Sequence, residues 1–102
     1  RTDRVDTDFL ATGLTRAAAV EFGRKKIRIN AVCPGMTETP MLDQTLQSGG
    51  PEIRNVMLNM IPLGRFGKPQ EIAGTVLFLC SDAASYITAK SIVVGGGQAI
   101  RA

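Results

Sequence analysis

The sequence predicts an α/β fold built on a parallel sheet, and two observations support this. Helical and strand-like segments follow one another in the order helix, strand, helices, strand, which is typical of parallel sheets. The two expected strands, at residues 27–33 and 91–94, are apolar enough to be covered on both faces, as parallel strands usually are. Because three or more strands are normally needed for a stable sheet, we expect residues 1–102 to form a single partial domain of a larger layer structure.

The first expected helix spans residues 7–22. Apolar side chains recur in it at intervals of four and therefore share one helix face. They are Leu10, Leu14, Ala18 and Phe22. Asp6 or Thr7 is expected to cap the start, because short polar side chains accept hydrogen bonds from the free N–H groups of a first turn. Gly23 is expected to end the helix in a left-handed conformation.

A strand is expected over residues 27–33, where apolar residues alternate with others, as in a strand with one strongly apolar face. The alternating residues are Ile27, Ile29, Ala31 and Cys33. The strand runs straight into the Pro34-Gly35 turn. Its open edge would invite pairing with another chain.

The middle of the chain predicts two short helices, at residues 40–47 and 51–60, separated by a glycine-rich break at 48–51. We interpret the whole segment 38–68 as a mobile lid, although an ordinary helical hairpin would have the same pattern.

A turn-rich bridge follows, and Pro69 then suits the first position of a helix over residues 69–80. The wide apolar stripe of this helix predicts that it is mostly buried. A short helical segment is expected at 83–87, capped by Ser81 or Asp82. The second strand, 91–94, is stopped by three glycines.

Composition narrows the class of protein. The chain carries twelve basic and nine acidic residues, with a net charge of +3. The basic run 24–28 leaves phosphate binding open, but basic residues after a helix also complement its negative end. With one tyrosine and no tryptophan, nucleic-acid binding is disfavoured.

The cysteines and the apolar runs bear on metal binding and on membrane contact. Cys33 and Cys80 lie far apart in apolar stretches, and the chain has no histidine, so we expect two reduced, buried cysteines and no metal site. No apolar run is long enough to span a bilayer, and the start is polar; we therefore expect a cytoplasmic protein without membrane contact.

Five pieces of the sequence, in this order and spacing, resemble the C-terminal part of the short-chain dehydrogenase/reductase family. They cover about residues 10 to 97. The pieces are Gly13-Leu14-Thr15-Arg16, Ile27 to Gly35, Thr39-Pro40-Met41, Pro62 to Pro69, and Leu77 to Thr88. The resemblance implies the C-terminal portion of a Rossmann-like, doubly wound parallel sheet, contributing two strands and their flanking helices.

The resemblance also implies a cofactor, NAD or NADP, and a small alcohol or ketone as substrate. Pro34 and Gly35 would lie against the nicotinamide ring. The backbone of Thr37 would hydrogen-bond the carboxamide, and the Thr39 hydroxyl would reach the carboxamide or a nearby phosphate. A Pro-Gly turn suits this role because glycine lets the backbone approach a flat ring closely. The family further implies a homo-oligomer.

Departures from the family pattern bear on activity. Arg4 stands where the family has its general acid, a tyrosine, and Asp8 where it has the lysine that lowers the pKa of that tyrosine. Arginine keeps its proton at any working pH, and a carboxylate would raise the pKa of a phenol. Tyr86, the only tyrosine, is expected to serve packing.

Other departures concern glycines. The family's Gly-rich cofactor loop has no counterpart in this sequence. The family also usually has a glycine at Ala89 and an aspartate at Gly95, which puts the local backbone and the end of the last strand in question. We therefore expect the C-terminal part of an NAD(P)-dependent oxidoreductase, inactive as an isolated chain and without catalytic residues. The alternative is a non-catalytic binding or assembly module that keeps the family core.

Overall fold

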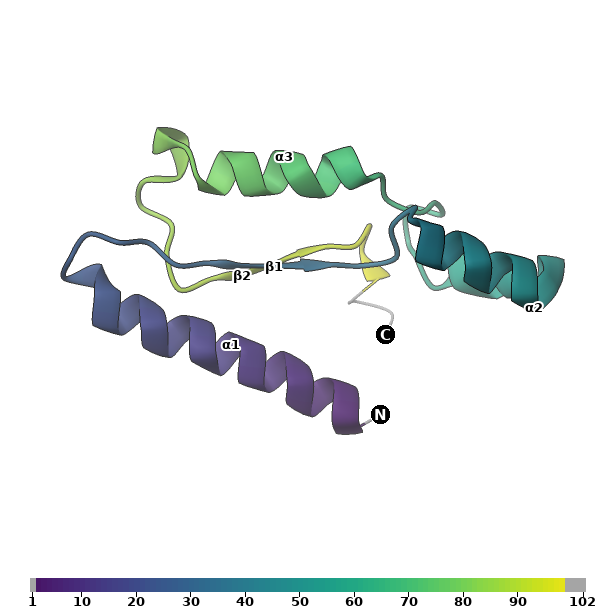
Figure 1. The fold of residues 1–102 in the computed structure, drawn as a ribbon, viewed down its shortest axis with the longest axis horizontal. Helices are drawn as coiled ribbons and strands as arrows, with labels where there is room; N and C mark the ends of the chain where they lie inside the picture. Colours follow the sequence, from purple (N-terminus) through teal and green to yellow (C-terminus); the bar gives the residue numbers. More distant parts are fainter. Residues whose placement is uncertain (1, 99–102) are drawn as a thin grey trace. The chain divides into compact units, whose positions relative to one another are not determined.

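The structure, a computed structural model, describes the backbone of residues 2–98 and the side chains of residues 12–98. It is an α/β arrangement with one two-stranded parallel sheet, β1-β2 (Figure 1). The elements are α1 (Thr2–Gly23), β1 (Ala31–Pro34), α2 (Pro40–Asn59), α3 (Pro69–Leu79), the 3-10 helix η1 (Asp82–Ala84) and β2 (Ser91–Val94). The predicted fold class is confirmed.

The described residues divide into two compact units. The first contains residues 2–32 and 76–92, and the second contains residues 33–75 and 93–98. Within residues 2–98, no helix has both the length and the apolar character that crossing a membrane requires.

Helix α1 differs from its prediction at both ends. It begins at Thr2, so Asp6 and Thr7 lie inside the helix and do not cap it. At its other end the left-handed residue is Lys26, with φ 62°, and not Gly23. The Ile27 N–H donates to the Phe22 carbonyl (3.2 Å) and the Lys26 N–H to the Gly23 carbonyl (2.9 Å), which together form a Schellman motif. The left-handed residue thus lies in the turn that follows α1, and the prediction that Gly23 adopts this conformation is wrong.

Strand β2 has its predicted bounds, whereas β1 begins four residues later than expected. The cause lies at Ala89, which has a left-handed φ of 64°. The backbone there diverts the Lys90 N–H to the side-chain Oδ1 of Asn30 (3.1 Å), while the Ala89 N–H donates to the Ile29 carbonyl (2.8 Å). Regular pairing therefore starts only at Ala31, whose N–H donates to the Lys90 carbonyl at 2.8 Å.

Two polar side chains fasten the segment before β1 within the first unit. Asn30 Nδ2 and Arg28 both donate to the Ile87 carbonyl, at 3.0 and 3.2 Å. Arg28 also donates to the Ser81 carbonyl at 3.5 Å. Because its guanidinium is engaged by backbone carbonyls, Arg28 serves the fold, and phosphate binding by this member of the basic run is disfavoured.

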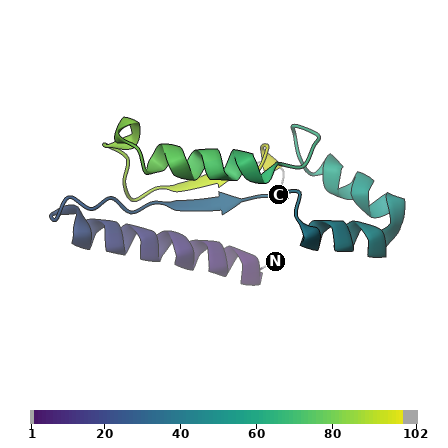
Figure 2. The ribbon, with the colours of Figure 1, turned by 45° about the horizontal axis from the view of Figure 1, so that its top comes forward.

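Helix α2 contains the two predicted helices, separated by a kink. Gly50 has φ 75° and ψ −178°, which no regular helix contains, and Pro51 follows it. Figure 2 shows the two pieces of α2 at an angle to each other. At the start, Thr39 Oγ1 accepts a hydrogen bond from the Leu42 N–H (3.2 Å) and Pro40 occupies the first turn, so the helix is capped as its sequence favours.

Helix α3 begins at Pro69 as predicted, but it is not mostly buried. Leu79 is its one buried side chain, while Val76, Leu77 and Phe78 are 43%, 72% and 48% exposed. The two described strands are only four residues long each, so they cannot cover the whole apolar stripe of α3.

Three smaller expectations after β1 and α3 are also corrected. Cys33 is half-buried and Cys80 exposed, so the expectation that both are buried is wrong. The segment expected at 83–87 is the shorter η1, and the Ser81 hydroxyl donates back to Phe78 and does not cap it. Tyr86 is fully exposed, so it does not serve packing among the described residues.

Candidate functional site

The four residues predicted to contact a cofactor meet at one surface hollow. Pro34, Gly35, Thr37 and Thr39 all line it, and its volume is about 320 Å³. The hollow belongs to the second unit and is completed by residues of the turn and of α2. These are Met36, Met41, Leu42, Thr45 and Met57. The four residues that the sequence analysis grouped therefore lie together at the end of β1, and their contact with a cofactor stays a prediction.

Gly35 is required by the chain's own packing. A Cβ atom at this position would lie 2.8 Å from the Cα of Gly95 and 2.9 Å from Oε1 of Gln98. Contacts this short do not occur at real Cβ atoms, and the Gly95 backbone cannot yield as a flexible side chain would. The expected reason for this glycine, close approach to a ring, is thus joined by a second reason that needs no ligand.

Thr37 is held by its neighbours and still offers polar groups. Its hydroxyl donates to the Gly35 carbonyl at 3.0 Å, so the lone pairs of Oγ1 remain available. Gly67 accepts from the Glu38 N–H (2.8 Å) and donates to the Met36 carbonyl (3.0 Å). Because backbone groups alternate in direction along an extended segment, the Thr37 N–H faces away from Gly67. Among the backbone groups of residues 2–98 and the side chains of residues 12–98 it has no hydrogen-bond acceptor.

Thr39 contributes differently. It is exposed, and its Oγ1 accepts the capping hydrogen bond from Leu42. A hydroxyl that accepts in this way still has its own hydrogen to donate. Thr37 and Thr39 together therefore present one N–H donor, one hydroxyl acceptor and one hydroxyl donor.

This set of groups fits a neutral amide. A carboxamide has one acceptor oxygen and two N–H donors, and such groups pair with backbone N–H and hydroxyl partners. No charged side chain is among the described residues that line the hollow, so nothing there would neutralise a phosphate. Its volume is at the low end of about 300–1,000 Å³ for ligand pockets, which suits a flat ring more than a whole dinucleotide.

Sequence reasoning missed the apolar wall of the hollow. Three of the chain's four methionines, Met36, Met41 and Met57, line it. The signal was partly present, because Met57 lies on the apolar side of the second predicted helix. Methionine is flexible and fills irregular gaps, so this wall can adapt to a ligand.

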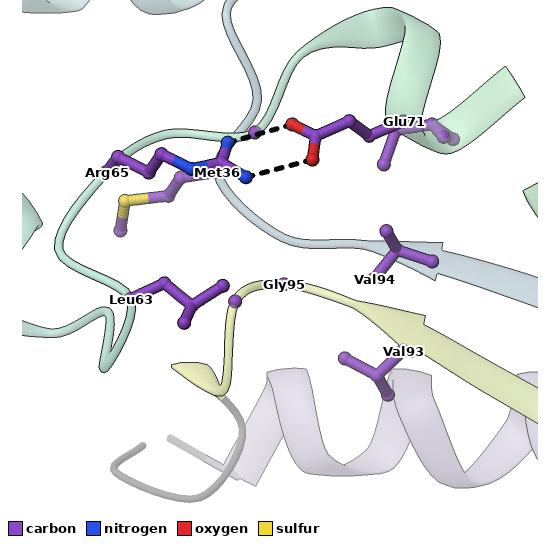
Figure 3. Close-up of a pocket in the computed structure, with 10 residues that line it drawn as sticks. Met36, Leu63, Arg65, Glu71, Val93, Val94 and Gly95 are labelled. Carbon is purple, nitrogen blue, oxygen red and sulfur yellow. Dashed lines mark hydrogen bonds and ion pairs between the residues drawn. The ribbon is translucent and has the colours of Figure 1, made fainter. Parts of the chain in front are cut away.

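A second hollow, of about 270 Å³, lies beside the Arg65–Glu71 ion pair (Figure 3). The guanidinium donates to both carboxylate oxygens, at 2.8 and 2.9 Å. These hydrogen bonds, together with one from the Lys68 N–H, lower the pKa of Glu71 to about 2. Both charged groups are engaged with each other, so the pair fastens the start of α3 to the preceding loop.

The positions of the family's acid and lysine lie outside the described side chains. Arg4 and Asp8 belong to the backbone of α1, but their side chains are not among those described. In the part of the chain whose side chains are described, no group of three or more metal-ligating residues gathers.

Comparison with known proteins gives consistent matches. A family model described as enoyl-(acyl carrier protein) reductase matches residues 10–99. The 3-oxoacyl-(acyl-carrier-protein) reductase FabG of Thermotoga maritima is 46% identical over 88 residues, which make up 86% of this chain and 34% of that protein. The chain spans about a third of the length of the curated relatives it matches.

Solved structures agree. The TT0495 protein from Thermus thermophilus has a TM-score of 0.79 at 39% identity, over 90% of this chain and 38% of that one. A short chain dehydrogenase from Bacillus anthracis has a TM-score of 0.71 at 41% identity, over 87% of this chain and 33% of that one.

Proposed function

Because the chain belongs to the short-chain dehydrogenase/reductase family, we propose that it is the C-terminal part of an NAD(P)-dependent oxidoreductase and forms the carboxamide side of its nicotinamide pocket. The observation that supports this most is the single hollow shared by Pro34, Gly35, Thr37 and Thr39. The parent reaction is reversible hydride transfer between the nicotinamide and a small alcohol or ketone. A bound reduced nicotinamide supplies the hydride.

Each residue then has a stated role. The Thr37 N–H, which has no acceptor among the described groups of the chain, donates to the carboxamide oxygen, and Thr37 Oγ1 accepts from the amide nitrogen. The Thr39 hydroxyl reaches the carboxamide or a nearby phosphate. The exposed ring of Pro34 and the backbone at Gly35 cover one face of the nicotinamide.

We also propose that the 102-residue chain alone does not turn over. Arg4 and Asp8 stand where the family has its proton donor and the lysine beside it. A positioned general acid contributes about 10²–10⁴-fold in rate, and arginine does not release its proton. Purified chain with NADH or NADPH and a panel of ketones should give no cofactor oxidation above background; sustained oxidation would contradict this.

Ligand-observed saturation-transfer NMR with NADH tests the binding role. Saturation of the protein should reach the nicotinamide protons more strongly than the adenine protons, because only the carboxamide end meets fitting groups. Thr37→Val should weaken the nicotinamide signal, whereas Thr75→Val, at a half-buried position of α3 that does not line the hollow, should leave it unchanged. A stronger adenine signal, or equal effects of the two variants, would overturn the proposal.

The alternative function, a non-catalytic assembly module, is favoured by one observation. Val76, Leu77 and Phe78 form an exposed apolar run on α3, and large exposed apolar groups often mark interaction sites. On either function we propose a homo-oligomer, and sedimentation at several concentrations tests it; a monomer throughout would contradict it. The lid at 38–68, the single partial domain 1–102 and the cytoplasmic location remain proposals.

A further inference from the structure

A tight turn at the end of the described chain packs against the proposed nicotinamide wall. The Gln98 N–H donates to the Gly95 carbonyl at 3.0 Å, and the two residues between them, Gly96 and Gly97, have φ of 61° and 89°. Two positive φ angles at the central positions are those of a type I′ turn, which strongly favours glycine. The glycines that follow β2 therefore reverse the chain and return Gln98 toward β1.

This turn is fixed from a second side. A Cβ atom on Gly96 would lie 2.9 Å from Ile61, and one on Gly97 would lie 2.9 Å from Pro62. The Leu63 N–H donates to the Gly96 carbonyl at 3.1 Å. Because residues 61–63 pack this closely against Gly96 and Gly97, the turn is held in one position, and so is the start of the Gln98 side chain.

Gln98 uses that position to hold the turn after β1. It is the one buried polar residue among the described side chains, at 5% exposure. Its Oε1 accepts a hydrogen bond from the Met36 N–H at 3.3 Å. Sixty-two positions separate the two residues in the sequence, so no local sequence pattern predicts the contact.

The Met36 N–H belongs to the same peptide unit as the Gly35 carbonyl, and that carbonyl accepts from the Thr37 hydroxyl at 3.0 Å. Side chains thus hold both polar ends of one peptide plane. A glycine beside a peptide unit leaves that unit freer to rotate than any other residue would. Without these two hydrogen bonds, the plane that forms part of the hollow has no side chain to fix its direction.

We propose that Gln98 is a positioning residue for the nicotinamide carboxamide. Gln98 acts through the Gly35–Met36 peptide, whose plane it holds in one orientation. The Thr37 hydroxyl then donates to the Gly35 carbonyl, and its oxygen lone pairs face the ligand as acceptors. This inference rests on the proposed function, because it assigns Gln98 to the same hollow.

The test compares three variants of the 102-residue chain. Gln98→Met keeps the length of the side chain and removes the acceptor, whereas Gln98→Glu keeps an acceptor oxygen. The control, Gln70→Met, makes the same glutamine-to-methionine change at an exposed position near the start of α3. Two quantities are measured for each: hydrogen exchange of the Met36 amide by NMR, and the apparent Kd of NADH from the nicotinamide saturation-transfer signal. Unfolding curves give the folded fraction.

Gln98→Met should speed exchange at Met36 about 5- to 10-fold, as expected for a lost hydrogen bond, and raise the Kd of NADH about threefold or more. Gln98→Glu should restore both quantities to within about twofold, and Gln70→Met should change neither. If Gln98→Met does not fold, Gln98→Glu is compared with Gln98→Asn, whose shorter side chain should fail to restore exchange.

The outcomes separate the two ideas. Wild-type chain that gives no nicotinamide signal at millimolar NADH would overturn the proposed function and with it the positioning role. Met36 exchange that stays unchanged in Gln98→Met would overturn the contact itself. Faster exchange with an unchanged Kd would reduce Gln98 to a structural residue and overturn the inference.

Discussion

Replacing Gly35 by alanine tests the close packing beneath the hollow. The new Cβ atom would lie 2.8 Å from Gly95 Cα, so one of the two backbones must move. Overpacking of this kind costs about 1–3 kcal/mol. The φ of Gly35 is not in the left-handed region, so alanine can adopt the same backbone conformation. Because alanine also restricts the unfolded chain, this part of the change stabilises the folded state by about 0.4–1 kcal/mol. We expect Gly35→Ala to lower the free energy of unfolding by about 1–2 kcal/mol.

Gly74→Ala is the matched control. Gly74 lies inside α3, and a Cβ atom there would meet no atom within 4 Å. The same chemical change should therefore stabilise the chain by up to about 1 kcal/mol, since alanine is the better helix former. The two variants should move stability in opposite directions.

Urea unfolding followed by circular dichroism measures both changes, with equal slopes as the condition for comparing midpoints. Thermal unfolding should agree, with Gly35→Ala melting about 4–15 °C lower. A Gly35→Ala variant as stable as wild type, or stabilised like Gly74→Ala, would refute the packing that we infer between the two glycine segments.

Three further changes follow from the same structure. Ala89→Gly should raise stability by about 0.5–1 kcal/mol, because Ala89 holds a left-handed φ of 64° and glycine adopts it without strain; a loss in urea unfolding would contradict this. The pKa of Glu71 is lowered to about 2, chiefly by its hydrogen bond with Arg65, so its stabilising effect is complete above pH 4.5 and lost as pH falls toward 2. The stability difference between wild type and Glu71→Gln should therefore vanish near pH 2, and a constant difference would argue against the ion pair. Asn30→Ala removes hydrogen bonds to the Ile87 carbonyl and the Lys90 N–H and should cost about 1–3 kcal/mol in the same unfolding assay; a neutral result would show that solvent replaces them.

Local patterns predicted the elements well where one residue type decides the backbone. Pro69 starts α3, Gly50 and Pro51 divide α2, and β2 has its expected bounds. The family comparison also identified Ala89 as unusual, and its positive φ explains why β1 is short. In each of these places the sequence determines the conformation within a few residues.

Two predictions failed because one residue type did not decide the outcome. Gly23 is a good left-handed helix stop by sequence, yet α1 ends there without a left-handed residue, and the Schellman hydrogen bonds place that conformation at Lys26. The apolar stripe of α3 indicates burial, but burial also needs a surface to cover it, and the described strands provide little.

The same limit applies to the candidate site. Its four predicted residues are neighbours in the sequence, so a local motif was enough to group them. Gln98 was missed because its contact with Met36 depends on the turn at 95–98, which only the fold brings to the end of β1.

The central claim is that residues 34–39 form the carboxamide side of a nicotinamide pocket. Amide shift mapping of the isotope-labelled chain during titration with NADH tests it most directly. We predict that the largest shifts occur at the N–H groups of Gly35, Met36, Thr37 and Thr39, while Gly74 in α3 stays unchanged. Shifts of equal size throughout the chain, or shifts that leave residues 35–39 unaffected, would contradict it.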